Sequence, residues 1–580
     1  MILQALVRHY EDLRSLGKIP PQGWNKVKVS YALDLNSDGR LLRATSVQKE
    51  GPKGKKPALV PRLIDLPAPV KRSVNIAANF LCDNSTYILG YDLKGKPQRA
   101  KECFIACKEL HERLLSQADS APARAVERFF QNWEPEKAAE HPALEGCINE
   151  LAAGANLVFR FDGAFVHEDA AVRQAWQAFY DSSGEGEQAV CLVTGKTGPV
   201  EAIHPAIKGV QGAQSSGAAL VSFNAPAFCS YGKEQNLNAP TGKYAAFAYT
   251  SALNYMLADR EHLWRIGDTT VLCWAEGGEP EFQDAFGIFA LGASSSYTEK
   301  ELRDMFGQLL SGRAVQFDET LLDPERPFYI LGLAPNAARL SVRFFLRNSF
   351  GGFLKNVQAH YDRLEIVKPA YEKFEDIPLW KLLSETVNQN SRDKSPTPNM
   401  AGETLSAVLM DKPYPATLLN GALVRIRAER EITRGRAAII KAYYLKHPHP
   451  DIPKEVLTVS LNPDSTNIPY TLGRLFSVLE AVQSSANPGI NATVKDRYFN
   501  AASATPGHIF PILLNLSQKH LRKLEVGLRV HYEKQLTELM SILPEEFPPR
   551  LNLPQQGAFQ LGYYHQTQKR YEKKEAASNE

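Results

Sequence analysis

The chain has 580 residues, of which 44% are apolar and 23% charged, and its formal net charge is +3. These values are typical of a globular protein with more than one domain. No window approaches the ~20 apolar residues of a membrane-spanning helix. The seven cysteines contain no Cys-x-x-Cys pair of the kind that marks a zinc site. No signal-peptide pattern opens the chain, so we expect a cytoplasmic protein without a metal, a cofactor or a membrane contact.

The first half of the chain alternates short strands with helices. Runs rich in β-branched and aromatic residues predict strands over Val27–Leu33, Leu157–Phe161, Ala189–Val193, Thr270–Trp274 and Phe328–Leu333. Apolar periodicity predicts helices over Ala100–Gln117, Ala121–Asn132, Ala170–Phe179 and Ala245–Leu257. The stretch Ala334–Arg339 predicts a turn between two apolar runs.

After Asn348 the pattern becomes helical. A long helix is predicted from Gly351 to Glu365, and Asn388–Pro398 is predicted to be a mobile linker. Four helices of a bundle are predicted over Tyr470–Gln483, Lys495–Ala502, Gly507–Lys523 and Leu524–Leu543. The sequence thus predicts an α+β protein: a mixed α/β domain (1–345), a helical connecting region (346–450) and a C-terminal four-helix bundle (451–580).

Two local zones are strongly basic. Residues 40–72 hold nine basic and two acidic residues, and residues 412–446 hold eight and two. In the second zone Arg427, Arg430, Arg434 and Lys441 recur at helical spacing, and such a row can follow a phosphate backbone. The candidates for backbone contact are Lys53, Lys55, Lys56, Lys71, Arg425, Arg427, Arg430, Arg434, Arg436 and Lys441. The alternatives are a solvated loop for the first zone and salt bridges to a neighbouring helix or subunit for the second.

Several motifs resemble catalytic or metal-binding sites without meeting their requirements. Gly195-Lys196-Thr197 lacks the glycine that a phosphate-binding loop has five positions earlier, where Val190 stands. His447 and His449 have no third clustered ligand for a metal ion. The sequence therefore predicts that the chain is not an enzyme.

A family resemblance extends over nearly the whole chain. It is carried by the polar stretch Lys208–Leu257 together with Asn79–Asn84, Phe328–Asn336, Arg339–Phe345, Thr471–Leu475 and Asn491–Phe499. The chain resembles the large subunit of the type I-C CRISPR interference complex, Cascade. In RNA-guided complexes base pairing reads the target, whereas the protein reads a short flanking motif, the protospacer-adjacent motif.

The resemblance implies a non-catalytic subunit that reads this motif, promotes R-loop formation, holds the displaced strand and helps to recruit the helicase-nuclease. Its implied partners are guide RNA, double-stranded target DNA, and the backbone, handle-capping and small helical subunits of Cascade. Two alternatives stay open. The chain could be a nucleic-acid-processing enzyme, such as a nuclease with an unrecognised site, or a scaffold that touches RNA and protein only.

Two polar segments offer the residue types that suit the minor groove, where amides and close backbone meet base acceptors. The first set is Arg72, Asn75, Asn79 and Asn84. The second is Gln211, Gln214, Ser215, Ser216, Asn224, Ser230, Tyr231, Lys233, Gln235 and Asn238. Phe223, Phe228 and Tyr231 are candidates for a wedge that enters the base stack. The alternative for each residue is structural, since buried amides often satisfy loop backbone.

Overall fold

The computed structural model describes residues 2–53, 56–70, 76–93, 95–182, 186–372 and 374–571, and only the backbone of residues 52, 53 and 56–58. About 48% of the chain is helix and 16% strand, which confirms the predicted α+β class. The chain divides into two compact units. Unit 1 comprises Met1–Pro205 and Val221–Tyr255, and unit 2 comprises Ala206–Leu220 and Met256–Glu580. The three consecutive segments expected from the sequence stay a prediction.

The main sheet of unit 1 has the strand order β3-β2-β8-β7, with β9 paired to β8. Its strands are β2 (Tyr31–Leu35), β3 (Leu41–Ser46), β7 (Cys82–Asn84), β8 (Asn156–Phe161) and β9 (Ala164–Phe165). Strands β2 and β8 are parallel, and the other pairs are antiparallel. The remaining antiparallel pairs are β1 (Trp24–Val29) with β6 (Arg62–Pro67), β4 (Lys49–Lys53) with β5 (Lys56–Val60), and β10 (Gln188–Val190) with β11 (Thr197–Pro199).

Two strand predictions in unit 1 differ from the structure. The strand predicted over Val27–Leu33 is divided at Ser30, because β1 pairs with β6 while β2 pairs with β3 and β8. The strand predicted over Ala189–Val193 ends early, since the Cys191 amide donates a 2.9 Å hydrogen bond to the carbonyl oxygen of Lys196 and closes a turn. The first difference arises from strand pairing with residues distant in the sequence, and the second arises from the hydrogen bond that closes the turn.

Helices pack on the sheet of unit 1 to form its core. They are α2 (Ser85–Ile88), α3 (Pro97–Leu115), α4 (Ala121–Asn132), α5 (Ile148–Ala152) and α6 (Ala170–Ser182). Helix α1 (Ile2–Ser15) contacts α7 (Lys243–Ala258) instead, where the ring of Tyr10 lies 5.6 Å from that of Phe247. The predicted bounds of α4 are confirmed, and its start is fixed by Ser120, whose side chain accepts from the Ala123 amide. The rings of Phe129 and Phe130 pack 5.5 and 5.7 Å from that of Phe159 on β8.

Unit 2 begins with an antiparallel sheet of order β12-β13-β16-β17. Its strands are β12 (Trp264–Ile266), β13 (Thr269–Ala275), β16 (Pro327–Asn336) and β17 (Arg339–Ser349), and a separate hairpin joins β14 (Val315–Phe317) to β15 (Thr320–Leu322). The turn predicted over Ala334–Arg339 is shorter in the structure, because β16 extends to Asn336 and β17 begins at Arg339; Ala337 between them adopts a left-handed φ of +52°. Two helices precede β14: α8 (Glu281–Leu291) and α9 (Glu299–Leu310).

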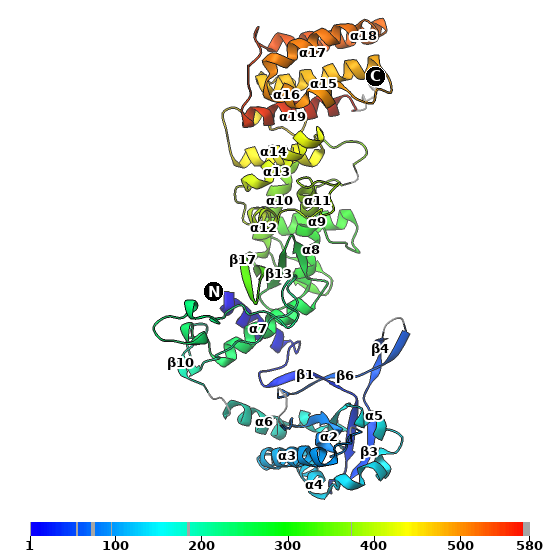
Figure 1. Ribbon diagram of the computed structural model, residues 1–580, viewed down its shortest axis with the longest axis vertical. Helices are drawn as coiled ribbons and strands as arrows, with labels where there is room; N and C mark the ends of the chain where they lie inside the picture. Colours follow the sequence, from blue (N-terminus) through cyan, green and yellow to red (C-terminus); the bar gives the residue numbers. More distant parts are fainter. Residues whose placement is uncertain are drawn as a thin grey trace. The chain divides into compact units, whose positions relative to one another are not determined.

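The helices of unit 2 share one continuous core with this sheet. They are α10 (Phe350–Leu364), α11 (Leu379–Ser384), α12 (Pro398–Leu409), α13 (Ala416–Glu429) and α14 (Arg434–Lys446). Within unit 2, Figure 1 shows the sheet at one end, the C-terminal bundle at the other and these helices between them. The segment predicted as a linker has no regular structure up to Thr397, and α12 begins at Pro398.

The C-terminal bundle contains the four predicted helices and a fifth that the sequence analysis did not predict. The four are α15 (Ile468–Ala486), α16 (Val494–Ala504), α17 (Pro506–Leu521) and α18 (Val526–Ile542). The fifth, α19 (Leu553–Lys569), packs closely along α15, and its residues from Gly557 to Gln566 are all buried. Helix α19 also contacts α14, so the last helix of the chain joins the bundle to the helices that precede it (Figure 1).

Candidate nucleic-acid interface

Asn79 and Asn84 support the backbone around them. Asn79 Oδ1 accepts a 2.9 Å hydrogen bond from the Val70 amide, and Asn84 Oδ1 caps α2 by accepting from the Thr86 amide at 3.1 Å. The buried carboxylate of Asp83 accepts from the backbone amides of both asparagines. Their Nδ2 groups have no partner among the residues that the structure describes. The oxygens thus have a structural role, and the two NH₂ groups remain as donors.

Residues 206–220 of unit 2 form a closed loop, which we call the polar loop. Its ends are joined by two backbone hydrogen bonds between Ile207 and Ala218, of 2.9 and 2.8 Å. Ala219 then bridges to Arg339 at the start of β17 in parallel register. The Gln211 amide donates to Thr270 Oγ1 of β13 at 3.2 Å. These contacts attach the loop backbone to the sheet at its C-terminal end and in the middle, and the Ile207–Ala218 pair closes the loop on itself.

The tip of the polar loop presents four polar side chains to solvent. Gln211, Gln214, Ser215 and Ser216 are exposed, and none of the four side chains has a hydrogen-bond partner within the described ranges. A turn shapes the tip, because the Gly217 amide donates to the Gln214 carbonyl oxygen at 2.9 Å and Gly217 has a φ of +105°. The arrangement combines a fixed backbone with donors and acceptors that are free to meet a ligand.

The second part of the predicted polar set lies in unit 1, in residues 230–238, which we call the tyrosine loop. Asn238 organises this loop: its Oδ1 accepts from the Ser230 amide at 2.8 Å, and its Nδ2 donates to the carbonyl oxygens of Lys233 and Gln235 at 3.1 and 2.9 Å. Both the oxygen and the nitrogen of the Asn238 side chain are therefore used in hydrogen bonds within the loop. This side chain supports the loop backbone rather than reading bases.

Tyr231 is the most prominent residue of the tyrosine loop. Its side chain is 99% exposed, and its φ of +55° lies in the left-handed region that is unusual for a large side chain. Phe228 is 40% exposed and Phe223 is half-buried, so Tyr231 is the most accessible of the three wedge candidates. The nearby predicted residues Asn224, Ser230, Lys233 and Gln235 are also exposed.

The structure describes no side chain for most of the candidate residues in and just after the first basic zone. Lys55, Lys71, Arg72 and Asn75 lie outside the described residues, and for Lys53 and Lys56 the backbone alone is described. That backbone places Lys53 opposite Lys56 in the β4–β5 hairpin, which forms a two-stranded sheet of its own. Phosphate contact by this hairpin stays a prediction.

The single basic helix predicted over Arg425–Lys446 is wrong. The chain forms α13 and α14 instead, separated at Arg430, whose φ of +55° ends α13. Arg427 and Arg430 are exposed, but Arg434, Arg436 and Lys441 are only 8%, 3% and 3% exposed. The row of cations therefore does not share one solvent-facing surface.

The three buried cations are satisfied inside unit 2. Arg436 contacts the carboxylates of Glu429 and Glu385, and Arg425 lies 3.6 Å from Glu429 as well. Lys441 Nζ donates to the carbonyl oxygen of Glu365 at 2.7 Å, and burial lowers its pKa. Arg434 donates to the carbonyl oxygens of residues 374 and 375. Arg436 thus forms an ion pair with a neighbouring helix, whereas Arg434 and Lys441 are held by backbone carbonyl oxygens. Contact of the exposed cations of this zone with phosphate stays a prediction.

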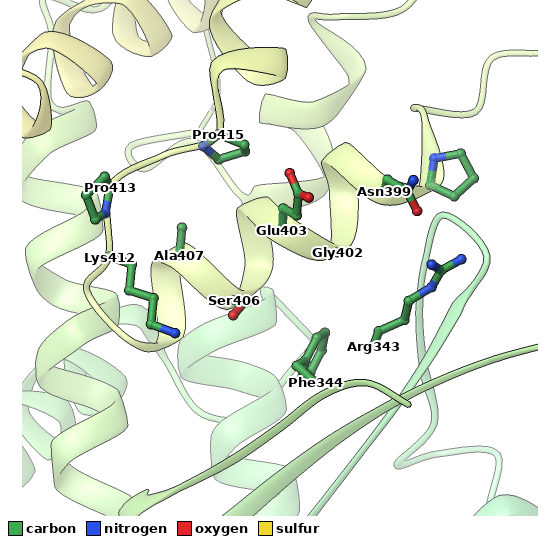
Figure 2. A pocket seen from close by; sticks show the side chains of 11 residues that line it. Arg343, Phe344, Asn399, Gly402, Glu403, Ser406, Ala407, Lys412, Pro413 and Pro415 are labelled. Atoms are coloured by element: carbon green, nitrogen blue, oxygen red, sulfur yellow. The ribbon is translucent and has the colours of Figure 1, made fainter. Parts of the chain in front are cut away.

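The sequence analysis did not single out a hollow of about 450 Å³ beside α12. Figure 2 shows Arg343 and Lys412 toward opposite ends of this hollow, with Glu403 and Ser406 on the helix between them. Lys412 belongs to the second basic zone, but Arg343 comes from β17. No local pattern brings these residues together, so only the fold could reveal the hollow.

The described part of the chain offers no constellation for metal chemistry, since no three His, Cys, Asp or Glu residues within it are placed to hold a metal ion. Gly195-Lys196 forms a turn that leads into strand β11, whereas a phosphate-binding loop leads into a helix. Across the described ranges, no helix has the length and apolar character needed to span a membrane.

Comparison with known proteins places the chain in a family. Residues 6–571 match the family model of the CRISPR-associated protein Cas_Csd1. None of the curated proteins matches the chain. The match covers both units, including the polar loop, the tyrosine loop and the C-terminal bundle. The chain therefore belongs to the Cas_Csd1 family of CRISPR-associated proteins.

Proposed function

We propose that this chain is the large subunit of a type I-C Cascade complex and that its polar loop reads the protospacer-adjacent motif. The observation that carries the proposal is the tip of this loop, where Gln211, Gln214, Ser215 and Ser216 present unpartnered side chains on a hydrogen-bonded backbone. Amide and hydroxyl groups can pair with the adenine N3, thymine O2 and guanine N2 groups of the minor groove. A backbone fixed before binding lowers the entropy cost of that pairing.

Tyr231 is proposed as the wedge that helps to open the duplex. Apolar or aromatic side chains that insert between base steps unstack them at a cost of a few kcal/mol. A ring that is 99% exposed can reach a base stack without any rearrangement of the protein core. The NH₂ groups of Asn79 and Asn84 are proposed to donate further hydrogen bonds to the flanking duplex, since only the oxygens of these two side chains are used within the protein.

In this proposal the chain is not an enzyme. It assembles with guide RNA and with the backbone, handle-capping and small helical subunits, promotes R-loop formation, holds the displaced strand and helps to recruit the helicase-nuclease. The membership of the Cas_Csd1 family supports a place among other CRISPR-associated proteins. The absence of any predicted catalytic signature in the sequence supports a recognition role over the rival role of a nuclease.

The experiment compares the intact complex on short duplexes with and without candidate flanking motifs. The proposal expects tighter binding to one motif and no metal-dependent cleavage by the purified chain. Local opening is followed by a fluorescent adenine analogue at the base pair next to the motif. We expect Tyr231→Ala to reduce the fluorescence rise while the complex still assembles. Cleavage by the chain would support the nuclease, and assembly without any contribution to DNA binding would support the scaffold.

A further inference from the structure

Two adjoining hollows lie along α12 in unit 2. The first, of about 450 Å³, is lined by residues of β17, α12 and the segment 412–415. The second, of about 650 Å³, is lined by α12, α13 and residues 386–397, which include the segment predicted as a linker. Asn399 and Glu403 line both hollows, so the two form one trough. Each volume lies in the range of ~300–1,000 Å³ that small ligands occupy in proteins.

The first hollow combines cations with the exposed part of one ring, since Phe344 is 9% exposed and otherwise belongs to the core of unit 2. The ring of Phe344 forms part of its lining and packs against Gly332 of β16, where an added Cβ would lie 2.7 Å from the ring. Lys412 is exposed and has no ion pair among the described residues, whereas Arg343 contacts Asp268 at 2.8 Å and keeps 34% of its side chain exposed. In Figure 2 the two cations flank the side chains of Glu403 and Ser406.

The second hollow is polar and almost uncharged. Among the described residues that line it, Glu403 is the one charged residue. The lining also includes four hydroxyl residues and three asparagines, namely Thr386, Ser395, Thr397, Thr417, Asn388, Asn399 and Asn420. The side chains of Asn399 and Asn420 have no hydrogen-bond partner in the described ranges. Unpartnered amides can pair with the edges of an unstacked base, as in proteins that bind single strands.

From this geometry we infer that the α12 trough accepts unpaired nucleotides of a single-stranded nucleic acid. The phosphates lie toward Lys412 and Arg343, and a base lies against Phe344 with its edge toward Asn399 and Glu403. This inference rests on the proposed function, since it names where a displaced strand would be held. A row of cations alone would track phosphates, but a trough with a ring and free amides also contacts bases.

The carboxylate of Glu403 gives the trough a base preference. A carboxylate accepts a hydrogen bond from the amino group of cytosine, whereas the corresponding position of thymine or uracil is a carbonyl oxygen, which would face the carboxylate as a second acceptor. Glu403 is exposed and its placement in both hollows brings it near either base site. The trough therefore favours cytosine over thymine at the position beside Glu403.

The test measures binding of labelled decamers of deoxycytidine, deoxythymidine and ribocytidine to the purified full chain at low ionic strength. We expect Lys412→Gln and Asn399→Ala each to weaken binding of the deoxycytidine decamer by about tenfold, which corresponds to about 1.4 kcal/mol. Lys454→Gln is the matched control, because Lys454 is exposed and lines neither hollow. We expect Glu403→Gln to bring the affinities for deoxycytidine and deoxythymidine together.

The test distinguishes a DNA strand from an RNA strand, and it distinguishes failure of this inference from failure of the proposed function. Tighter binding of the deoxyribose decamer indicates the displaced DNA strand, and equal or tighter binding of ribocytidine indicates RNA. Unchanged binding in both Lys412→Gln and Asn399→Ala would overturn the inference, as would a base preference that persists in Glu403→Gln. The same variants are assayed in the complex for flanking-motif discrimination. If the variants bind single strands as the wild type does and still discriminate the flanking motif, the trough is rejected as a strand-binding site, and the proposed function is retained.

Discussion

Ser230 and Asn238 lie eight residues apart, and the backbone amide of Ser230 donates a 2.8 Å hydrogen bond to Asn238 Oδ1. The same side chain donates to two carbonyl oxygens of the tyrosine loop, so one amide closes the loop on which Tyr231 stands. A residue chosen from the sequence as a base reader is therefore a support for the neighbouring wedge candidate.

Asn238→Ala should loosen the tyrosine loop. Removal of the side chain leaves three backbone groups without their partner, and each lost hydrogen bond costs about 1 kcal/mol where water cannot replace it. We expect faster hydrogen exchange and earlier proteolytic cleavage within residues 230–238. Asn224→Ala is the control, since Asn224 is exposed, and it should leave both unchanged. Equal exchange rates in the two variants would show that Asn238 does not organise the loop.

Arg436→Gln should lower the stability of unit 2 rather than act directly on nucleic acid. The guanidinium is 3% exposed and contacts the carboxylates of Glu429 and Glu385. The variant removes the cation beside the largely buried Glu385 carboxylate, whereas Glu429 is exposed and keeps Arg425 nearby. We therefore expect a loss near the lower end of the roughly 3–5 kcal/mol that breaking a buried ion pair costs. Urea unfolding should show this loss, whereas Arg427→Gln at an exposed site should change stability by less than ~1 kcal/mol. Unaltered stability in Arg436→Gln would contradict the assignment.

Gly473→Ala should disrupt the C-terminal bundle. A Cβ atom at Gly473 of α15 would lie 1.9 Å from the carbonyl oxygen of Phe559 in α19, and neither backbone can move aside. Overpacking of this kind costs about 1–3 kcal/mol or more. Gly527→Ala in α18 has nothing within 4 Å of its added Cβ and should be neutral or stabilising by up to about 1 kcal/mol. Thermal unfolding of both variants measures the difference, and equal midpoints would argue against the close α15–α19 contact.

The stability of unit 2 should depend on pH through His262. Burial disfavours its charged form, but hydrogen bonds to Asp259 at 2.6 Å and to Asp284 at 2.7 Å outweigh that effect and raise the pKa of the imidazole. A raised folded-state pKa contributes stability that is complete below the ordinary histidine value of about 6.5 and disappears as pH rises through the folded-state value. The sign is therefore a loss of stability on the alkaline side.

The pH effect is measured as the difference in unfolding free energy between the wild type and His262→Gln. We expect this difference to be largest below about pH 6.5 and to shrink at higher pH. A difference that is constant with pH would mean that His262 is not charged between its two carboxylates.

Local signals in the sequence predicted much of the fold. Apolar periodicity predicted α4 with its observed bounds, and a turn within the predicted stretch Ala334–Arg339 separates β16 from β17. Helix α19 escaped prediction because Gly557 and Gly562 lower its intrinsic helix propensity. In the structure these glycines are favourable, since Gly562 lets the helix approach the backbone of Tyr470. Tertiary packing decides such an element, and propensity alone does not reveal it.

The candidate sites, like helix α19, depend on tertiary contacts that local sequence patterns do not reveal. The spacing of Arg434 and Lys441 is that of one helical face, but spacing cannot distinguish a face that meets solvent from one that meets buried carbonyl oxygens. Gln214 and Asn238 come from one polar stretch, yet the first is exposed and the second is bonded within its loop. Whether an amide is free depends on neighbours that only the folded chain defines.

The most direct test of the proposed function is motif discrimination by the complex assembled with guide RNA, before and after Gln211→Ala with Gln214→Ala in the polar loop. Asn79→Ala with Asn84→Ala tests the other polar segment, and Gln308→Ala, at an exposed amide outside the predicted motif-reading sets, serves as the control. We expect the polar-loop pair to abolish the difference in affinity between duplexes with and without the flanking motif while the complex still assembles. Discrimination that persists in the polar-loop pair would contradict the account and would place motif reading elsewhere.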